Sequence, residues 1–261
     1  MAFKKTEEGT SSIQKSLAVL SCFDEEILAL SLTDISRKLE IPLATASRIV
    51  GTLLKEGFLD KGINDKFYRL GLKCYRLGQL AQKSGVIRNL AYAYMSVLRD
   101  RFNETVNLYV RNGKYRVVYE QIESAHYLKR SARIGEKFPL FAGAAGRCFM
   151  AYMVQKDIEW ILSDLERITE NTIVDPNVIY SRIEAIRQNG YEVSAEEREE
   201  GISCVAAPIF SSPGQVAVVL VLTGPSFRFT SDVVDSMIPA IIETAKNIST
   251  KLNAVNSTLI P

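Results

Sequence analysis

The chain has 261 residues, of which 47% are hydrophobic and 24% charged, a balance typical of folded soluble proteins that excludes a disordered or collagen-like chain. At about 150 residues per domain, this length predicts one large domain or two modest ones. The net charge is +2, so binding to a polyanion requires local clustering of basic residues. The four cysteines are far apart without a CxxC pair, which argues against a zinc site or a disulfide scaffold. We therefore expect no metal and no cofactor, and a reducing cytoplasm as the location.

Two segments bear on targeting and membrane insertion. Residues 1–11 contain lysines without an apolar core after them, so they do not form a secretory signal. Residues 201–227 carry no charge, but a proline and a turn sequence at 211–215 divide them into the apolar runs 202–210 and 216–222. Two buried strands joined by a tight turn fit this pattern better than a membrane helix of about 20 uninterrupted residues. We expect a soluble protein with no membrane partner.

Basic residues are concentrated in the N-terminal third. Residues 1–85 contain 13 Lys and Arg against 10 Asp and Glu, whereas the remainder contains 19 against 20. Within residues 37–83, ten basic residues stand against four acidic ones. This distribution is typical of nucleic-acid contact, although many solvated helix faces are equally basic.

Three helical patterns follow one another in this region. The first, over residues 12–22, is marked by a predicted buried stripe at helical spacing: Ile13, Leu17 and Leu20. Ser31 and Asp34 have the spacing of a capping box for the second helix. That helix ends before Pro42, because proline disfavours helical geometry in the residue that precedes it.

The third helix begins with Pro42 in its first turn and ends before Gly57, a residue suited to a left-handed cap. Its predicted inward side is apolar: Ala46, Ile49, Val50, Leu53 and Leu54. Its predicted outward side carries short hydroxyls and one arginine: Thr45, Ser47, Arg48 and Thr52. Such side chains suit a DNA major groove, where hydroxyls contact phosphates or base edges and arginine binds guanine or phosphate bidentately. An ordinary polar surface on a small three-helix core is the alternative.

Two short strands, at 58–59 and 67–70, surround a polar loop after this helix. A hairpin after a helix-turn-helix forms a wing, and its basic side chains would lie near the flanking DNA backbone. The joint pattern predicts DNA binding, with these candidate contacts: Thr33, Leu43, Thr45, Ser47, Arg48, Thr52, Lys66 and Arg69.

The rest of the chain alternates helices and strands. Proline-free residues 71–85 predict a connecting helix, and the apolar side of a helix over 86–103 would cover a sheet. Strand patterns occur at 105–111, 115–122 and 127–133. Helical patterns occur at 144–153, 157–165, 177–189 and 231–252. Antiparallel strands with segregated helices predict an α+β fold.

Residues 138–146, rich in glycine and alanine, directly precede one of these helices. Small residues let a ligand approach the backbone, and the amides of residues 143–146 would suit a carboxylate. Close packing of the helix on the sheet is the alternative reading.

Catalysis is the alternative to a binding function. Cys204 could act as a nucleophile, with acid or base groups from a glutamate cluster: Glu196, Glu197, Glu199 and Glu200. The only histidine, His126, falls in a predicted loop, and the sequence contains no GxSxG, HExxH or P-loop motif. A thiol among apolar neighbours is more often buried and inert, and clustered glutamates are usually a solvated surface. We expect no catalytic residues and no enzyme.

The sequence resembles the IclR family of bacterial transcriptional regulators. The matching segments are SIQKSLAVL, LTDISRKLEIPLATASRIVGTLLKEGFL, YRLGLKCYRLG, ETVNLYV, RIGEKFPLFAGAAGRCFMAYM, IRQNGYEVSAEEREEGISCVAAPIF and LTGPSFRF. The resemblance implies a winged helix-turn-helix over 10–72, a linker helix over 73–86 and a GAF-like effector-binding domain over 87–256. It also implies a homodimer, or a dimer of dimers, that binds a double-stranded DNA operator. The expected activity is repression of a catabolic operon under control of a small organic-acid effector.

The resemblance also implies an effector site made by the loop before the helix at 144, a residue ahead of the glutamates, the cysteine after them and the last strand. These positions fall on Gly143, Ala144, Ala145, Ser194, Cys204, Val221 and Thr223, with Tyr127, Arg130 and Phe138 as further wall residues. Ser194 and Val221 stand where the family often has aspartate and serine, so we expect a less polar pocket for a small acid with some apolar body. Arg147 replaces the family's usual lysine and keeps the positive charge. The alternative, a sensor or scaffold without DNA binding, requires that the face from Thr45 to Arg48 be covered.

Overall fold

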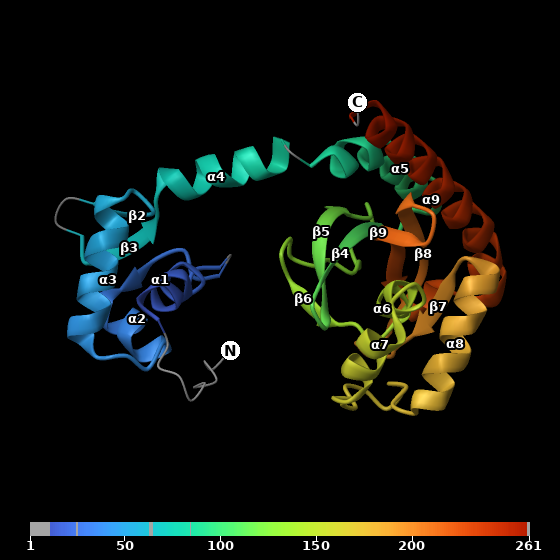
Figure 1. The fold of residues 1–261 in the computed structure, drawn as a ribbon, viewed down its shortest axis with the longest axis horizontal. Coiled ribbons are helices and arrows are strands. Elements are labelled where there is room, and N and C mark those ends of the chain that lie inside the picture. The colour runs from blue at the N-terminus through green and yellow to red at the C-terminus, as the bar shows by residue number, and fades with distance from the viewer. Residues whose placement is uncertain (1–10, 25, 63–64, 84, 260–261) are drawn as a thin grey trace. The chain divides into compact units, whose positions relative to one another are not determined.

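The structure, a computed structural model, describes residues 11–24, 26–62, 65–83 and 85–259. The chain forms two compact units with the boundary between Gly85 and Val86 (Figure 1). The first ten residues, on which the expectation about a secretory signal rests, lie outside the described residues.

The N-terminal unit combines helices with a small antiparallel sheet. Its helices are α1 (Ser12–Leu20), α2 (Leu32–Lys38), α3 (Leu43–Lys55) and α4 (Leu72–Lys83). Its strands are β1 (Leu30–Ser31), β2 (Leu59–Lys61) and β3 (Phe67–Leu70), in the order β1-β3-β2. Strands β2 and β3 are the predicted hairpin, whereas β1 has two residues and is too short to leave a recognisable pattern.

Local sequence signals determine where the helices of this unit begin and end. The N–H of Asp34 donates to the Ser31 hydroxyl (3.2 Å), and the Ser31 N–H donates to the Asp34 carboxylate (3.2 Å), which confirms the capping box. Gly57 follows α3 with a φ of +75°, as expected of a left-handed cap. Pro42 is the N-cap of α3 rather than a residue of its first turn, one position earlier than predicted.

Two details of the predicted apolar stripes are wrong. Ile13 and Leu17 are 73% and 59% exposed, and α1 buries Ala18 and Val19 instead. Leu54, predicted to face inward, is also exposed. In both helices the buried stripe is narrower than the run of apolar residues, so side chains at its edge stay in solvent.

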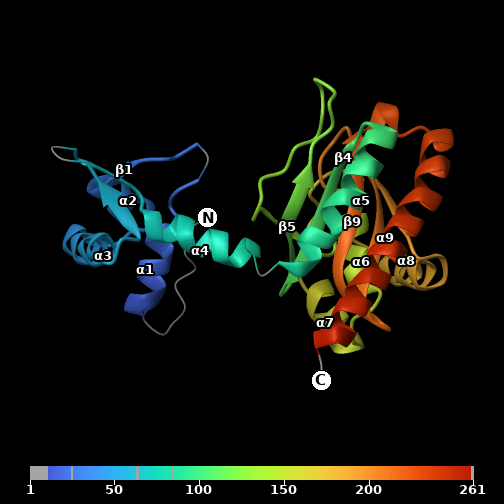
Figure 2. The same ribbon diagram turned by 90° about the horizontal axis from the view of Figure 1, so that it is seen from above.

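The C-terminal unit is a six-stranded antiparallel sheet covered by helices on both faces (Figures 1 and 2). Its strands, in the order β6-β5-β4-β9-β8-β7, are β4 (Thr105–Asn112), β5 (Tyr115–Ile122), β6 (Lys137–Pro139), β7 (Glu192–Ala195), β8 (Ile202–Ser212) and β9 (Gln215–Pro225). Its helices are α5 (Val86–Phe102), α6 (Ala144–Met150), α7 (Gln155–Leu162), α8 (Pro176–Asn189) and α9 (Ser231–Leu259), with a 3-10 turn at η1 (Ser226–Arg228). A helix-turn-helix unit followed by an α+β unit confirms the predicted fold class.

Both faces of the sheet belong to hydrophobic cores. Helices α5 and α9 pack on one face, and α6, α7 and α8 pack on the other. Along β9, Val219 and Val221 point to the α6 side, and Leu220 and Leu222 point to the α5 and α9 side. Because neither side reaches solvent at the centre of the sheet, β8 and β9 carry no charge. This confirms the prediction of two buried strands joined by a tight turn, in which Gly214 has a φ of +75°.

The strand predicted at 127–133 is wrong, because no strand forms there. The backbone N–H of Ala132 donates to the side chain of Gln121 (2.7 Å) instead of to a strand backbone. The edge strand is β6, which pairs with β5 a few residues later. Strand β7 was not predicted, since its four residues include the charged Glu192.

Among the helices of the described residues, none combines the length and the apolar composition that crossing a bilayer requires.

Candidate functional site

The outer face of α3 is polar, short-chained and exposed. Ser47, Arg48 and Thr52 are exposed along it, and Thr45 is half-buried at its edge. The other predicted contacts are exposed as well: Thr33 near the start of α2, Leu43 at the start of α3, Lys66 beside β3 and Arg69 in β3. Opposite, Ala46, Ile49, Val50 and Leu53 are buried. The face that the sequence predicted to be free of the protein core is therefore accessible in this unit.

The polar groups on this surface differ in whether they have partners within the chain. Arg69 forms an ion pair with Asp65 at 2.7 Å. The Thr52 hydroxyl donates to the carbonyl of Arg48 at 3.0 Å. The guanidinium of Arg48 forms no hydrogen bond or ion pair with the described part of the chain. Arg48 thus offers a full set of donors to a partner outside the chain.

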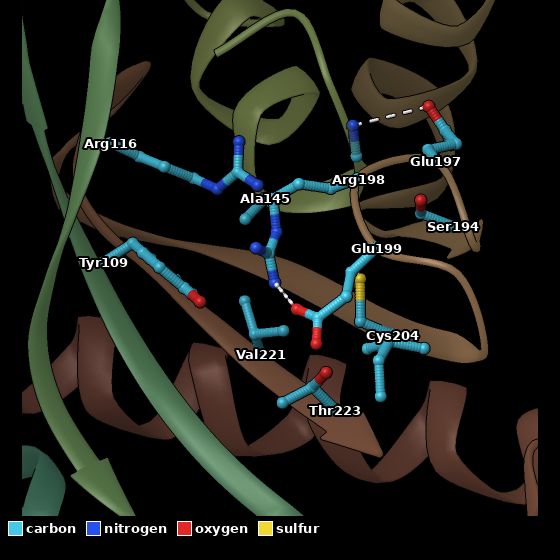
Figure 3. Close-up of a pocket in the computed structure, with 12 residues that line it drawn as sticks. Tyr109, Arg116, Ala145, Ser194, Glu197, Arg198, Glu199, Cys204, Val221 and Thr223 are labelled. Carbon is cyan, nitrogen blue, oxygen red and sulfur yellow. Dashed lines mark hydrogen bonds and ion pairs between the residues drawn. The ribbon is translucent and has the colours of Figure 1, made fainter. Parts of the chain in front are cut away.

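A second candidate site is a pocket between the sheet and the segment that joins β7 to β8 (Figure 3). Tyr109 and Arg116 enter it from β4 and β5, while Arg198 reaches across it from the connecting segment (Figure 3). The complete lining is Tyr109, Arg116, Gly143, Ala145, Ser194, Glu197, Arg198, Glu199, Ile202, Cys204, Val221 and Thr223. Its free volume is only about 30 Å³, because the long side chains of its own wall fill it.

Six of the ten predicted effector residues line this pocket: Gly143, Ala145, Ser194, Cys204, Val221 and Thr223. Ala144 is buried beside it. Phe138 and Arg130 lie next to the lining, since the guanidinium of Arg198 stacks 4.1 Å from the Phe138 ring and Arg130 binds Glu199 at 2.8 Å. Tyr127 does not reach the pocket and is fully exposed.

The two glycines at the start of α6 have different structural roles. Gly143 has a φ of +86°, and a Cβ there would lie 3.5 Å from Arg116 Nη2 and 3.7 Å from Ser194 Oγ. A Cβ on Gly146 would lie 1.8 Å from the carbonyl oxygen of Leu140. Gly146 therefore serves close packing, whereas Gly143 opens the backbone toward the pocket.

Behind the pocket, Arg147 is fully buried in an ion-pair network. It binds Glu197 through two hydrogen bonds of 2.5 and 2.6 Å, and Glu192 at 3.4 Å. Burial raises the pKa of Glu197, but the hydrogen bonds and charge of Arg147 outweigh it and hold this pKa below its ordinary value. The prediction that the glutamate cluster is a solvated surface is therefore wrong for Glu197.

The same carboxylate changes the expected role of the loop amides. The N–H of Gly143 donates to Glu197 Oε2 at 3.4 Å, so the anion at this amide belongs to the protein itself. The sequence predicts that the Gly143 amide binds a ligand carboxylate. This is wrong for Gly143, because the carboxylate of Glu197 already accepts from it and would repel a second anion.

Arg116 is the buried cation that the sequence analysis missed. Its side chain donates to the carbonyls of Pro139 and Ala142 and stacks on Tyr109 and Phe138. Its Nε has no hydrogen-bond partner, and burial lowers its pKa to about 10, which leaves it charged at neutral pH. The alternation of β5, in which Arg116, Val118 and Glu120 are all buried, is the signal that could have indicated an inward arginine.

Cys204 has the environment of an unreactive thiol. Burial raises its pKa, so the nucleophilic thiolate is disfavoured at neutral pH. His126, the only histidine of the chain, contacts Asn103 at 3.1 Å. The described residues contain no cluster of three or more histidine, cysteine, aspartate or glutamate side chains that could hold a metal ion.

Comparison with known proteins identifies the class of molecule to which these two sites belong. The family model for the IclR helix-turn-helix domain matches residues 12–62, and the model for the C-terminal domain of bacterial transcriptional regulators of the IclR type matches residues 79–250. The chain belongs to the IclR family of transcriptional regulators.

Individual relatives cover nearly the whole chain. The HTH-type transcriptional repressor AllR of Escherichia coli K12 is 28% identical over 248 residues, which span 94% of this chain and 92% of that protein. The IclR structure from Thermotoga maritima is 28% identical with a TM-score of 0.76 and covers 93% of this chain and 98% of that one. An IclR homologue from Microbacterium hydrocarbonoxydans, solved in complex with 4-hydroxybenzoate, is 25% identical with a TM-score of 0.82 and covers 94% and 100%.

Proposed function

We propose that this protein represses a catabolic operon in the cytoplasm by binding a double-stranded DNA operator, and that a small organic acid in the pocket controls this binding. The observation that carries the DNA-binding part is the exposed face of α3, where the guanidinium of Arg48 has no partner in the described chain. Short hydroxyls around one free arginine fit a major groove. An acidic side chain would repel phosphate, and α3 contains none.

The proposed DNA contacts fall into two groups. Those of α2 and α3 enter or border the major groove: Thr33, Leu43, Thr45, Ser47, Arg48 and Thr52. Lys66 and Arg69 of the wing contact the flanking backbone, where Arg69 would exchange Asp65 for phosphate. Repression is supported by the relative AllR, which is described as a repressor.

The effector is proposed to bind in the pocket of the C-terminal unit. Gly143, Ala145, Ser194, Cys204, Val221 and Thr223 line this pocket, and Ala144, Phe138 and Arg130 support its walls. The homologue solved with 4-hydroxybenzoate supports an acid as the ligand class. Tyr127 is fully exposed and does not line the pocket, so it is not part of the proposed site.

Pairing of two copies is proposed through apolar side chains that the N-terminal unit leaves in solvent. Leu72 and Tyr75 on α4 are 79% and 66% exposed, and Ile13 and Leu17 on α1 are exposed as well. A homodimer, or a dimer of such dimers, would place two recognition helices on the half-sites of a palindromic operator. We propose no catalytic role, since burial disfavours the Cys204 thiolate.

Two binding measurements on the full-length protein test this function. Fluorescence anisotropy with labelled fragments of the DNA upstream of its own gene should find a fragment bound about 10³-fold more tightly than unrelated DNA. A panel of small carboxylic acids should contain one that raises the melting temperature, because a ligand bound only to the native state stabilises it. Equal binding to all fragments would exclude an operator-specific regulator, and the absence of any stabilising acid would exclude the acid effector.

A further inference from the structure

Three guanidinium groups gather around one aromatic ring at the side of the pocket. Those of Arg198, Arg116 and Arg130 lie 4.1, 5.6 and 5.9 Å from the centroid of the Phe138 ring. Arg116 comes from β5 and Arg198 from the segment after β7, and both line the pocket. Together with burial, which is the larger cause, the charge of Arg198 contributes to lowering the pKa of Arg116, so the two like charges interact. Such an arrangement is costly in a buried place unless anions compensate it.

The chain supplies too few anions for this cluster. Arg130 and Arg198 share the single carboxylate of Glu199, at 2.8 and 3.1 Å. Arg116 has only carbonyl oxygens as partners within the described residues, and its side chain is 4% exposed with an unpartnered Nε. The other carboxylate of the lining, that of Glu197, is committed to Arg147. The arginine side of the pocket therefore retains about two positive charges.

The opposite side of the pocket offers neutral groups. Ser194, Cys204 and Thr223 contribute hydroxyls and a thiol, with the Thr223 hydroxyl donating to the carbonyl of Ser203 at 3.2 Å. Val221 and Ile202 add apolar surface. Figure 3 shows the Tyr109 hydroxyl and the Arg198 side chain directed into the space between these two sides. An anionic ligand is thus attracted to one side only.

We infer that Arg116 and Arg198 bind the acid groups of the effector, and that the pocket selects a small molecule with two acid groups over one with a single acid group. This inference rests on the proposed effector function of the same pocket. On binding, one acid group takes the place of Glu199 as the partner of Arg198, and the other neutralises Arg116. Arg198 reaches across the pocket, whose free volume is about 30 Å³, so its side chain must move aside before a ligand can enter and must then bind the ligand's acid group.

The test uses matched pairs of probes that differ by one carboxylate: succinate against butyrate, and glutarate against valerate. Titration calorimetry and melting temperatures are measured on the full-length protein at constant ionic strength. We expect a diacid to bind at least tenfold more tightly than its monoacid counterpart, since each charge-assisted contact is favourable only where a guanidinium is available.

Two variants should change diacid affinity in opposite directions. Arg198→Gln removes one anion-binding group and should weaken diacid binding at least tenfold, with partial recovery in Arg198→Lys. Glu199→Gln removes the carboxylate that competes with the ligand for Arg198 and should strengthen diacid binding several-fold. Arg111→Gln on β4, which loses only a half-exposed ion pair with Asp157 at 3.5 Å, is the matched control and should bind as the unchanged protein does. A purely structural role of these residues would weaken binding in both pocket variants.

The outcomes separate this inference from the proposed function. Diacid preference with opposite shifts in Arg198→Gln and Glu199→Gln supports the inference. Equal binding of diacids and monoacids, or unchanged affinity in Arg198→Gln, overturns it and leaves an acid-sensing regulator. If no acid of either kind binds, the inference and the acid effector fall together, while operator binding is tested independently by anisotropy.

Discussion

The exposed face of α3 and the region around the pocket of the C-terminal unit differ in how the charge of an arginine is stabilised. Arg48 lies in solvent, which hydrates its charge, so it can remain without a partner in the chain until a polyanion arrives. Arg147 is fully buried and is stable only with the carboxylates of Glu197 and Glu192 beside it. Arg116 is buried without such a carboxylate, and this contrast identifies the place where the chain needs an anion from outside.

The largest effect should come from removing the buried paired arginine. Arg147→Met keeps much of the side-chain volume but leaves Glu197 and Glu192 buried, with Arg182 at 3.6 Å as the remaining cation near Glu192. We expect the C-terminal unit to lose about 3–5 kcal/mol of unfolding free energy. Urea unfolding can be followed by the fluorescence of Trp160, the only tryptophan of the chain.

The matched control for this variant is Arg111→Met, whose half-exposed pair should contribute less than about 1 kcal/mol. A loss in Arg147→Met no larger than in this control would break the contrast between buried and exposed arginines.

The same variant should reverse one component of the pH dependence. In the unchanged protein the pKa of Glu197 is held below its ordinary value of 4.5, so its stabilising contribution is present above that pH and is lost on further acidification. Without Arg147, burial raises this pKa, and protonation then relieves an unpaired charge. The stability difference between the two proteins should therefore narrow between pH 7 and pH 5. Glu192, whose pKa burial already raises, contributes in the same direction. A constant difference over this range would mean that neither carboxylate is left uncompensated.

The smallest effect concerns the open side of α3. Gly51 lies on this side, and a Cβ added to it would meet nothing within 4 Å. Gly51→Ala should stabilise the helix by about 0.5–1 kcal/mol, because alanine has the higher helix propensity. It should nevertheless weaken operator binding if the helix backbone approaches DNA closely.

Gly78→Ala in α4, where a Cβ is also unobstructed, is the matched control, with a similar gain in thermal stability and unchanged DNA affinity. Equal DNA affinity in both variants would argue against close contact of α3 with DNA.

The two sites differ in how much of them the sequence could predict. The polar face of α3 is one continuous segment, so helical periodicity and capping residues placed Arg48 outside and Ile49 inside correctly. The pocket combines strands far apart in the chain, and no local pattern links Arg116 to Arg198 or to Phe138. The family resemblance supplied the neutral side of the pocket together with Phe138 and Arg130. The alternation of β5 could have indicated an inward Arg116, but its place beside Arg198 and Phe138 became visible only in three dimensions.

The errors have the same origin. Residues 127–133 have the composition of a strand, but the backbone of Ala132 bonds to a side chain instead of a neighbouring strand. The glutamates after β7 have the composition of a surface, but Glu197 lies beside the buried Arg147. In each case a tertiary partner decided the outcome, and such partners are absent from local sequence patterns.

The salt dependence of operator binding in Arg48→Ala tests the central claim most directly. Anisotropy titrations from 50 to 200 mM salt should show a binding free energy that is less favourable by about 1–3 kcal/mol. If Arg48 contacts a phosphate, the slope of log K against log [salt] should also be smaller in magnitude by about 1. Arg167→Ala, an exposed arginine of the C-terminal unit, should retain the unchanged affinity and slope. If Arg48→Ala retains both as well, α3 is not the helix that reads the operator.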